Sequence, residues 1–469
     1  MKEKAQKLIA KNFSAPALSA VLLALAFSRG NLGILVWFGL VPLFLELNNK
    51  SRWQRWVLFL VFSVLFFALT LYWLIHVSLA ALIALCIFLA LEFSLFGLLM
   101  PSPSGKHSLW LIPLLWIIFE RLRGILFFGF GWSILGYTQF RNLALIQASQ
   151  YCGVWGISCL LVLSNICLSH AVFNRRGNSL KKNFVIIPLA CCLFVYAFGY
   201  FALSKTFPSP EINISLIQAN IPQDQKWDPK YSDAIVKKFS TLSKKAVAEA
   251  DDKPTLVIWP ETSVPGYLLD ETKLYLKVTN LAKELAVYLL VGSPREDYTR
   301  KKFYNTAFLF GPNGHLERFH DKIHLVPFGE YVPYKNFFPF LENSRIADFD
   351  AGNSYTIFDI KGREGKAVRF GVLICFEDVF PGLVKKFRDE GADFLITITN
   401  EAWFKNSSEP LQHTAISVFR AIENRCWFLR CANTGITCFI DPKGRIRKKI
   451  KQNGKDIFVE GIATMSLRD

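Results

Sequence analysis

The sequence lacks several patterns that would assign it to a familiar class. Its ten cysteines form no Cys-x-x-Cys pair, so the usual zinc-binding spacing is absent, and we expect no metal and no cofactor. There is no internal repeat and no low-complexity tract. Acidic residues are few: 37 Asp and Glu stand against 54 Lys and Arg, a formal net charge of +17. No basic element interleaved with aromatic residues accompanies this charge, so nucleic acid is not an expected partner.

Apolar residues, by contrast, are abundant. Of the 469 residues 52% are hydrophobic and 15% aromatic, and the mean hydropathy of +0.28 is too high for a purely soluble protein of this size. The apolar residues concentrate before about residue 205, which predicts a polytopic membrane domain over residues 1–205 and a soluble domain over 211–469. Seven apolar runs are candidate spans, the first two near the lower length limit: 15–27, 32–47, 56–75, 78–100, 109–119, 157–173 and 184–203.

Charge predicts the orientation of these spans. Basic residues gather in segments 1–11, 48–55 and 175–182, which the positive-inside rule assigns to the cytoplasm. Seven crossings from a cytoplasmic N-terminus place the soluble domain on the outer side of the membrane, and the bilayer is an expected partner. Glu92 lies within one apolar run, where a carboxylate is costly unless paired or hydrated, and no role is assigned to it.

The soluble region alternates short β-branched runs with helical patterns, which predicts an α/β layered domain. We expect helices at 231–250, 270–285, 381–390 and 412–424. We expect strands at 212–218, 255–259, 286–291, 305–310, 369–374, 394–399, 427–432 and 436–440.

Three reactive side chains follow strand-like runs in this region: Glu261, Lys322 and Cys375, in that order. A buried cysteine is most often a small core residue, and we interpret three others in this way: Cys426, Cys431 and Cys438. Cys375 differs because a carboxylate and an ammonium group accompany it, and a thiol needs a base to become an effective nucleophile. His320, Lys322 and His324 would share one face if that stretch is a strand; a metal site there is a separate hypothesis, but it lacks further ligands.

Longer segments carry a more specific resemblance. They are 120–124 (ERLRG), 135–139 (LGYTQ), 218–223 (QANIPQ) with Trp227, 304–306 (YNT), 326–333 (VPFGEYVP), 403–404 (WF), 412–413 (QH) and 433–435 (NTG). Through them the chain resembles the apolipoprotein N-acyltransferase family, the membrane branch of the nitrilase superfamily. The resemblance implies an α-helical polytopic membrane domain plus an α/β nitrilase-like αββα sandwich domain. It also implies a multi-pass protein of the bacterial inner (cytoplasmic) membrane whose catalytic domain faces the periplasm.

The implied reaction transfers an acyl chain from a phospholipid to the N-terminal amine of the diacylglyceryl-cysteine of an apolipoprotein. Glu261 is expected to take the thiol proton, Cys375 to hold the acyl chain as a thioester, and Lys322 to stabilise the oxyanion. Supporting or positioning roles are expected for Glu330, Asn305 and Glu377. Residues expected to bind or gate the acyl chains are Trp227, Phe376, Trp403 and Phe404.

The chain departs from the family pattern in four places. Gly131 stands where proline is common, Phe376 where tyrosine is frequent and Glu401 where aspartate is usual, and no span follows the soluble domain. Two other functions stay open. One is a membrane-tethered nitrilase-type amidase or esterase, in which water resolves the thioester, and the other is a non-catalytic membrane scaffold. The sequence does not specify the lipid headgroup, the acyl length, the lipoprotein clients or the oligomeric state.

Overall fold

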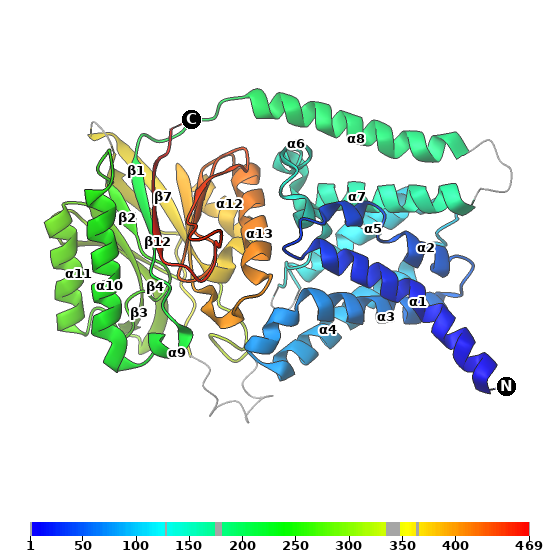
Figure 1. The fold of residues 1–469 in the computed structure, drawn as a ribbon, viewed down its shortest axis with the longest axis horizontal. Helices are drawn as coiled ribbons and strands as arrows, with labels where there is room; N and C mark the ends of the chain where they lie inside the picture. The colour runs from blue at the N-terminus through cyan, green and yellow to red at the C-terminus, as the bar shows by residue number, and fades with distance from the viewer. Residues whose placement is uncertain (1, 127–128, 174–180, 334–347, 363–364, 469) are drawn as a thin grey trace. The chain divides into compact units, whose positions relative to one another are not determined.

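The chain forms two compact units. The computed structural model describes residues 2–126, 129–173, 181–333, 348–362 and 365–468 (Figure 1). The first unit, here called the helical unit, contains Met1–Lys205 and Ser407–Glu423. The second, here called the sheet unit, contains Thr206–Asn406 and Asn424–Asp469. The helical unit therefore includes a segment that lies between two parts of the sheet unit in the sequence.

The helices of the helical unit are α1 (Lys2–Ala26), α2 (Val41–Leu47), α3 (Arg52–Thr70), α4 (Leu79–Leu99), α5 (Ser108–Arg123), α6 (Leu143–Ile146), α7 (Ser149–Phe173), α8 (Lys181–Ser204) and α13 (Glu409–Asn424). Within the described part of the chain, four helical segments have the length and composition of a membrane span: 52–70, 79–99, 149–173 and 186–204. Of the other three predicted spans, 15–27 falls on the apolar part of α1 at 13–26, 32–47 on the short helical stretch 33–47, and 109–119 on the 16-residue helix α5. A count of seven crossings therefore stays a prediction. Of the basic loop predicted at 175–182, residues 175–180 lie outside the described ranges.

Helices α3 and α4 pack closely through aromatic side chains. Gly97 of α4 permits the approach, since a Cβ atom there would lie only 2.6 Å from Cβ of Phe59. The ring of Phe93 is 5.5 Å from that of Phe59 and 4.9 Å from that of Trp116, measured between centroids. Another face of α4 carries an apolar stripe that is exposed: Ile83, Ile87, Leu91 and Leu95. An exposed apolar face of this extent suits contact with lipid.

Helix α13 is fixed in the helical unit by the side chain of Gln412. The amide oxygen accepts hydrogen bonds from the indole nitrogens of Trp132, at 2.7 Å, and Trp73, at 3.2 Å. The amide nitrogen donates to the carbonyl oxygen of Thr70, at 3.2 Å. One buried side chain thus satisfies polar groups from three other segments of the unit, which explains why α13 belongs to it.

The described residues of the sheet unit form two six-stranded sheets. One has the order β12 (Gly461–Ser466), β1 (Asn213–Gln218), β2 (Leu256–Ile258), β3 (Tyr288–Asp297), β4 (Lys302–Phe310), β5 (Leu316–Asp321). The other has the order β11 (Ile446–Lys449), β10 (Cys438–Ile440), β9 (Phe428–Ala432), β8 (Phe394–Thr399), β7 (Ala367–Ile374), β6 (Ile357–Lys361). The helices of this unit are α9 (Gln223–Lys226), α10 (Pro229–Ala248), α11 (Thr272–Leu285) and α12 (Pro381–Asp389).

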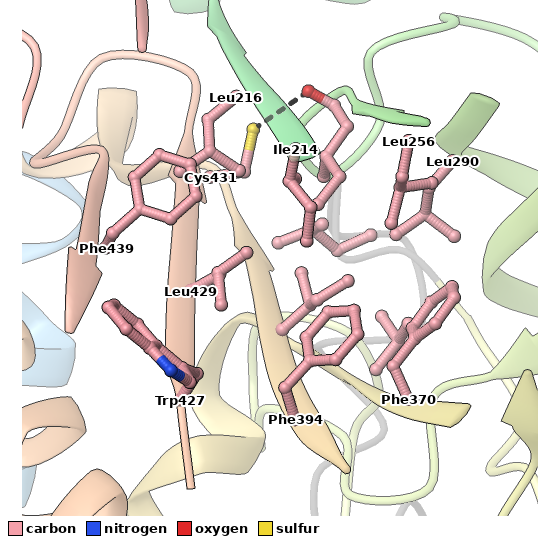
Figure 2. Close-up of a cluster of buried hydrophobic side chains, with 14 of the residues drawn as sticks. Ile214, Leu216, Leu256, Leu290, Phe370, Phe394, Trp427, Leu429, Cys431 and Phe439 are labelled. Carbon is pink, nitrogen blue, oxygen red and sulfur yellow. Dashed lines mark hydrogen bonds between the residues drawn. The ribbon is translucent and has the colours of Figure 1, made fainter. Parts of the chain in front are cut away.

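The two sheets enclose one hydrophobic core, part of which Figure 2 shows. Alternate residues of a strand face opposite sides, so Leu256 and Ile258 enter this core while Val257 joins a second cluster with α10 and α11. Helix α12 contacts β7 and β8 of the other sheet. Strands covered on both faces read as unbroken apolar runs, as the sequence does here. These layers confirm the predicted fold class, a helical membrane part with a nitrilase-like α/β sandwich.

Candidate active site

Glu261, Lys322 and Cys375 all lie just beyond the C-terminal ends of strands. Strands β2 and β3 are parallel, and β4 and β5 each run antiparallel to the strand before, so β5 has the direction of β2. Glu261 follows β2 and Lys322 follows β5, and the two residues therefore emerge at one edge of their sheet. Cys375 directly follows β7 of the other sheet. Such strand ends are where α/β proteins commonly place their sites.

The backbone is strained at two of these strand ends. Cys375 has φ +56° and Thr262, next to Glu261, has φ +45°, both in the left-handed region. A non-glycine residue in that region costs of order 1–3 kcal/mol, and such strain gathers at functional sites. The left-handed conformation of Cys375 turns the chain sharply at the end of β7, where a 3-10 helix (Cys375–Val379) begins.

Four of the predicted residues form one charge cluster. The ammonium group of Lys322, which is only 1% exposed, lies 2.8 Å from Glu330 Oε2 and 3.8 Å from Glu261 Oε1. The side-chain amide of Asn305 donates to both carboxylates, to Glu261 at 2.8 Å and to Glu330 at 3.0 Å. Asn305 therefore keeps two like-charged groups at a fixed separation around one cation.

The second oxygen of Glu261 is also fixed. It accepts a hydrogen bond of 2.9 Å from the backbone nitrogen of Asn400, directly after β8. The Asn400 side chain bonds in turn to Gln223, at 2.8 Å, and to Asn433, at 3.0 Å. The sequence reasoning did not select Asn400. A signal was present, because Gln223 and Asn433 both lie in the segments that carry the family resemblance.

Glu377 joins the segment after Lys322 to the strand before Cys375. Its carboxylate is buried and accepts backbone hydrogen bonds from Ile323 at 2.7 Å, His324 at 3.0 Å and Ile374 at 2.7 Å. Burial raises the pKa of Glu377 to about 7, although these N–H groups oppose the shift. This geometry suits a positioning residue, and that role of Glu377 stays a prediction.

The surroundings keep the Cys375 thiol neutral and the Lys322 ammonium group charged. Burial raises the pKa of the Cys375 thiol well above its usual range, the Glu261 carboxylate raises it further, and Lys322 opposes both. Cys375 is therefore protonated at neutral pH and needs a base before it can act as a nucleophile. Burial would lower the pKa of Lys322, but Glu330 and Glu261 outweigh burial and hold that pKa above its usual value. Lys322 is a permanent cation.

The predicted gate residues occupy several loops of the sheet unit. Trp227 follows α9, and Trp403 and Phe404 lie in a 3-10 helix after β8 (Glu401–Phe404). Trp227 and Trp403 are each about half exposed, so apolar ring surface is open to a ligand. Phe376 packs instead on Phe380, with ring centroids 5.2 Å apart.

Two further buried groups were missed by the sequence reasoning. Arg430 of β9 bonds to Glu401, at 2.5 Å, and to Asp378, at 3.4 Å, and so connects the loops that follow β8 and β7. Lys226 donates a hydrogen bond of 2.8 Å to the backbone carbonyl of Glu261. A lysine or arginine is usually exposed, so nothing in the local pattern marks these two as buried.

Two protein families match the chain and indicate the class of protein to which it belongs. Residues 213–468 match the carbon-nitrogen hydrolase family, and residues 19–167 match the apolipoprotein N-acyltransferase N-terminal domain. The chain is also similar to a solved nitrilase-superfamily protein, Nit3 of Saccharomyces cerevisiae, with TM-score 0.42 and 22% identity over 56% of this chain and 92% of that one.

Full-length relatives give the particular family. The apolipoprotein N-acyltransferase of Geobacter metallireducens is 37% identical, over 93% of this chain and 86% of the relative. That of Chlorobaculum tepidum is 32% identical, over 94% and 88%. The chain belongs to the apolipoprotein N-acyltransferase family. It is an acyltransferase and, with its four span-length apolar helices, a membrane protein. The family resemblance and the predicted enzyme class are confirmed.

Proposed function

We propose that the chain moves an acyl chain from a phospholipid to the N-terminal amine of the diacylglyceryl-cysteine of an apolipoprotein. The reaction has two steps, and a thioester on Cys375 is the intermediate between them. The observation that carries this proposal is the cluster of Glu261, Asn305, Lys322 and Glu330 at the strand ends. It supplies a base and a permanent cation for a thiol that is protonated at rest.

In the first step, Glu261 takes the thiol proton as the sulfur of Cys375 attacks the ester carbonyl of the phospholipid. Negative charge develops on the carbonyl oxygen, and the Lys322 ammonium group stabilises it. Stabilisation of this kind typically contributes about 3–4 kcal/mol. The carbon–oxygen ester bond then breaks, and Glu261 returns its proton to the departing lysophospholipid alkoxide. Cys375 is left as a neutral thioester.

In the second step, the amine of the acceptor attacks the thioester carbonyl. Glu261 takes a proton from the attacking nitrogen and gives it to the sulfur of Cys375 as the carbon–sulfur bond breaks. The product is an amide, and the thiol is restored. The exposed rings of Trp227 and Trp403 offer apolar surface to the acyl chains during both steps.

Both substrates are lipids, so the reaction belongs at a membrane surface. The four apolar helices of the helical unit support an integral location, and the basic segments support a cytoplasmic N-terminus. We place the protein in the bacterial inner membrane with the sheet unit facing the periplasm.

Mass spectrometry of a lipoprotein N-terminus, with and without this protein, tests the proposed function. We expect a third acyl chain, on the N-terminal nitrogen, only when the protein is present. Release of free fatty acid without any change in the lipoprotein would indicate the hydrolase instead, in which water resolves the thioester. A Cys375→Ala variant serves as the matched control, because it keeps the membrane helices and lacks the thiol.

A further inference from the structure

Lys226 is a second buried lysine beside Glu261. The residue is only 2% exposed, and its ammonium group donates one hydrogen bond, to the Glu261 carbonyl oxygen at 2.8 Å. Among the residues that the structure describes, this is the only hydrogen bond of that group. A buried lysine is almost always paired. Here two of its three bonding positions remain for a ligand.

The two lysines of the site differ in their protonation. Lys322 is held as a cation by Glu330 and Glu261. Burial lowers the pKa of Lys226 to about 7, and the negative charge of Glu261 acts in the other direction. Lys226 can therefore gain or lose a proton near neutral pH, whereas Lys322 cannot.

The second step of the reaction requires two proton transfers. An α-amino group has a pKa of about 8, so the acceptor arrives mostly as an ammonium ion, which cannot attack. One proton must leave before the attack and another during it. Glu261 serves the second transfer. The first needs another base, and Lys226 is the neighbouring buried amine, bonded among the described residues to the Glu261 main chain alone.

Building on the proposed function, we propose that Lys226 is this second base: its neutral amine takes a proton from the acceptor ammonium group once the acyl-enzyme has formed. One N–H bond of the acceptor breaks and one forms on Nζ of Lys226, and the freed electron pair attacks the thioester. Lys226 returns its proton to water when the product leaves.

The test uses the full chain and two variants, Lys226→Arg and Lys226→Gln. Cys375 is first loaded from phospholipid vesicles, and a synthetic diacylglyceryl-cysteine peptide is then added at pH 7. We expect both variants to load as the parent does and to discharge to the peptide at least about tenfold more slowly, since general bases typically contribute about 10²–10⁴-fold. At pH 9 the rate should recover, because the peptide amine then loses its proton to solvent.

Hydroxylamine, which is neutral at pH 7, provides the matched nucleophile. It should discharge the variants at the parent rate, because it needs no prior deprotonation. Lys230→Gln is the control variant, since Lys230 is exposed and contacts Asp228 and the adjacent Tyr231 ring.

Three results would overturn the inference. Parent-like discharge of Lys226→Arg to the peptide at pH 7 would show that a fixed cation suffices. An equal loss with hydroxylamine, or loss of loading in both variants, would show that Lys226 only shapes the site. A parent that forms no acyl-enzyme contradicts the proposed function itself. That failure is distinguishable because it is seen before any peptide is added.

Discussion

Lys322 and Glu330 form the tighter of the two ion pairs in the charge cluster, at 2.8 Å, while Lys322 and Glu261 are 3.8 Å apart. Glu330 therefore holds the buried cation in place. Glu261 stays close enough to stabilise the cation and distant enough to exchange protons. The division of work between the two carboxylates follows from this difference in distance.

Glu330→Gln should consequently lower both stability and activity. Lys322 would lose its nearest counter-ion while buried, and breaking a buried pair costs about 3–5 kcal/mol. The remaining charge would favour a direct pair with Glu261 and so weaken the base. We expect a lower unfolding midpoint in detergent and slower loading of Cys375. Glu249→Gln, on an exposed glutamate, should change neither; equal effects of both variants would contradict this assignment.

Substitution of any member of the predicted trio should prevent formation of the acyl-enzyme, each for a different reason. Cys375→Ala should give no acyl-enzyme, since no thiol is left at the strand end. Glu261→Gln should also give none, because it keeps the shape and removes the base. Lys322→Ala should prevent loading through loss of oxyanion stabilisation. Intact-mass measurement after incubation with phospholipid vesicles checks all three, and an acyl adduct on Cys375→Ala would rule out the nucleophile.

Two buried groups should give opposite pH dependences of stability. Burial raises the pKa of Glu377 from 4.5 to about 7, so the folded state binds more protons and stability falls as pH rises from about 4.5 to 7. Burial lowers the pKa of His320 from 6.5 to about 4, so stability rises with pH from about 4 to 6.5. Each effect amounts to about 3 kcal/mol, and the two largely cancel in the parent.

Single variants should reveal each slope. Glu377→Gln should leave the rising slope of His320, and His320→Leu should leave the falling slope of Glu377. Unfolding midpoints of the parent and both variants between pH 4.5 and 7.5 measure this. Parallel curves for all three proteins would show that neither group titrates differently in the folded and unfolded states.

Gln412→Ala should destabilise the helical unit. The variant removes the acceptor shared by two indole N–H groups, from Trp73 and Trp132, and an unsatisfied buried donor costs about 1–3 kcal/mol. We expect a lower unfolding midpoint. Gln452→Ala is the control, because Gln452 is exposed. No difference between the two variants would mean that the shared hydrogen bonds do not hold α13.

The membrane orientation can be mapped directly. Reporter fusions or thiol labelling within 48–55 should report the cytoplasm, and a fusion after residue 468 should report the periplasm. The reason is the concentration of basic residues in the predicted inner segments. A cytoplasmic signal from the C-terminal fusion would reverse the predicted topology.

The sequence allowed the central strands to be predicted, because strands covered on both faces are unbroken apolar runs. Strands β5, β6, β11 and β12 were not predicted. All four have mostly exposed or partly exposed residues, and β5 (LERFHD) and β11 (IRKK) read as surface segments. Their place in the sheets depends on hydrogen bonding to a neighbour, which residue pattern does not encode.

The same distinction applies to the candidate site. Glu261, Lys322 and Cys375 could be selected because reactive side chains stand beside apolar runs. Lys226 and Arg430 could not, because their burial depends on partners distant in the sequence, and a charged side chain alone predicts exposure. Helix α13 was predicted as a helix at 412–424. Its place in the helical unit depends on Gln412 and its indole partners, which lie far away in the sequence.

The path of the chain through α13 also constrains how such a protein can be recombined. The polypeptide leaves the sheet unit after β8, contributes one helix to the helical unit, and returns at β9. A chimaera joined near residue 205 would combine one parent's α13 with the other parent's indole donors. The two units can therefore be exchanged between relatives only when residues 407–423 travel with the N-terminal half.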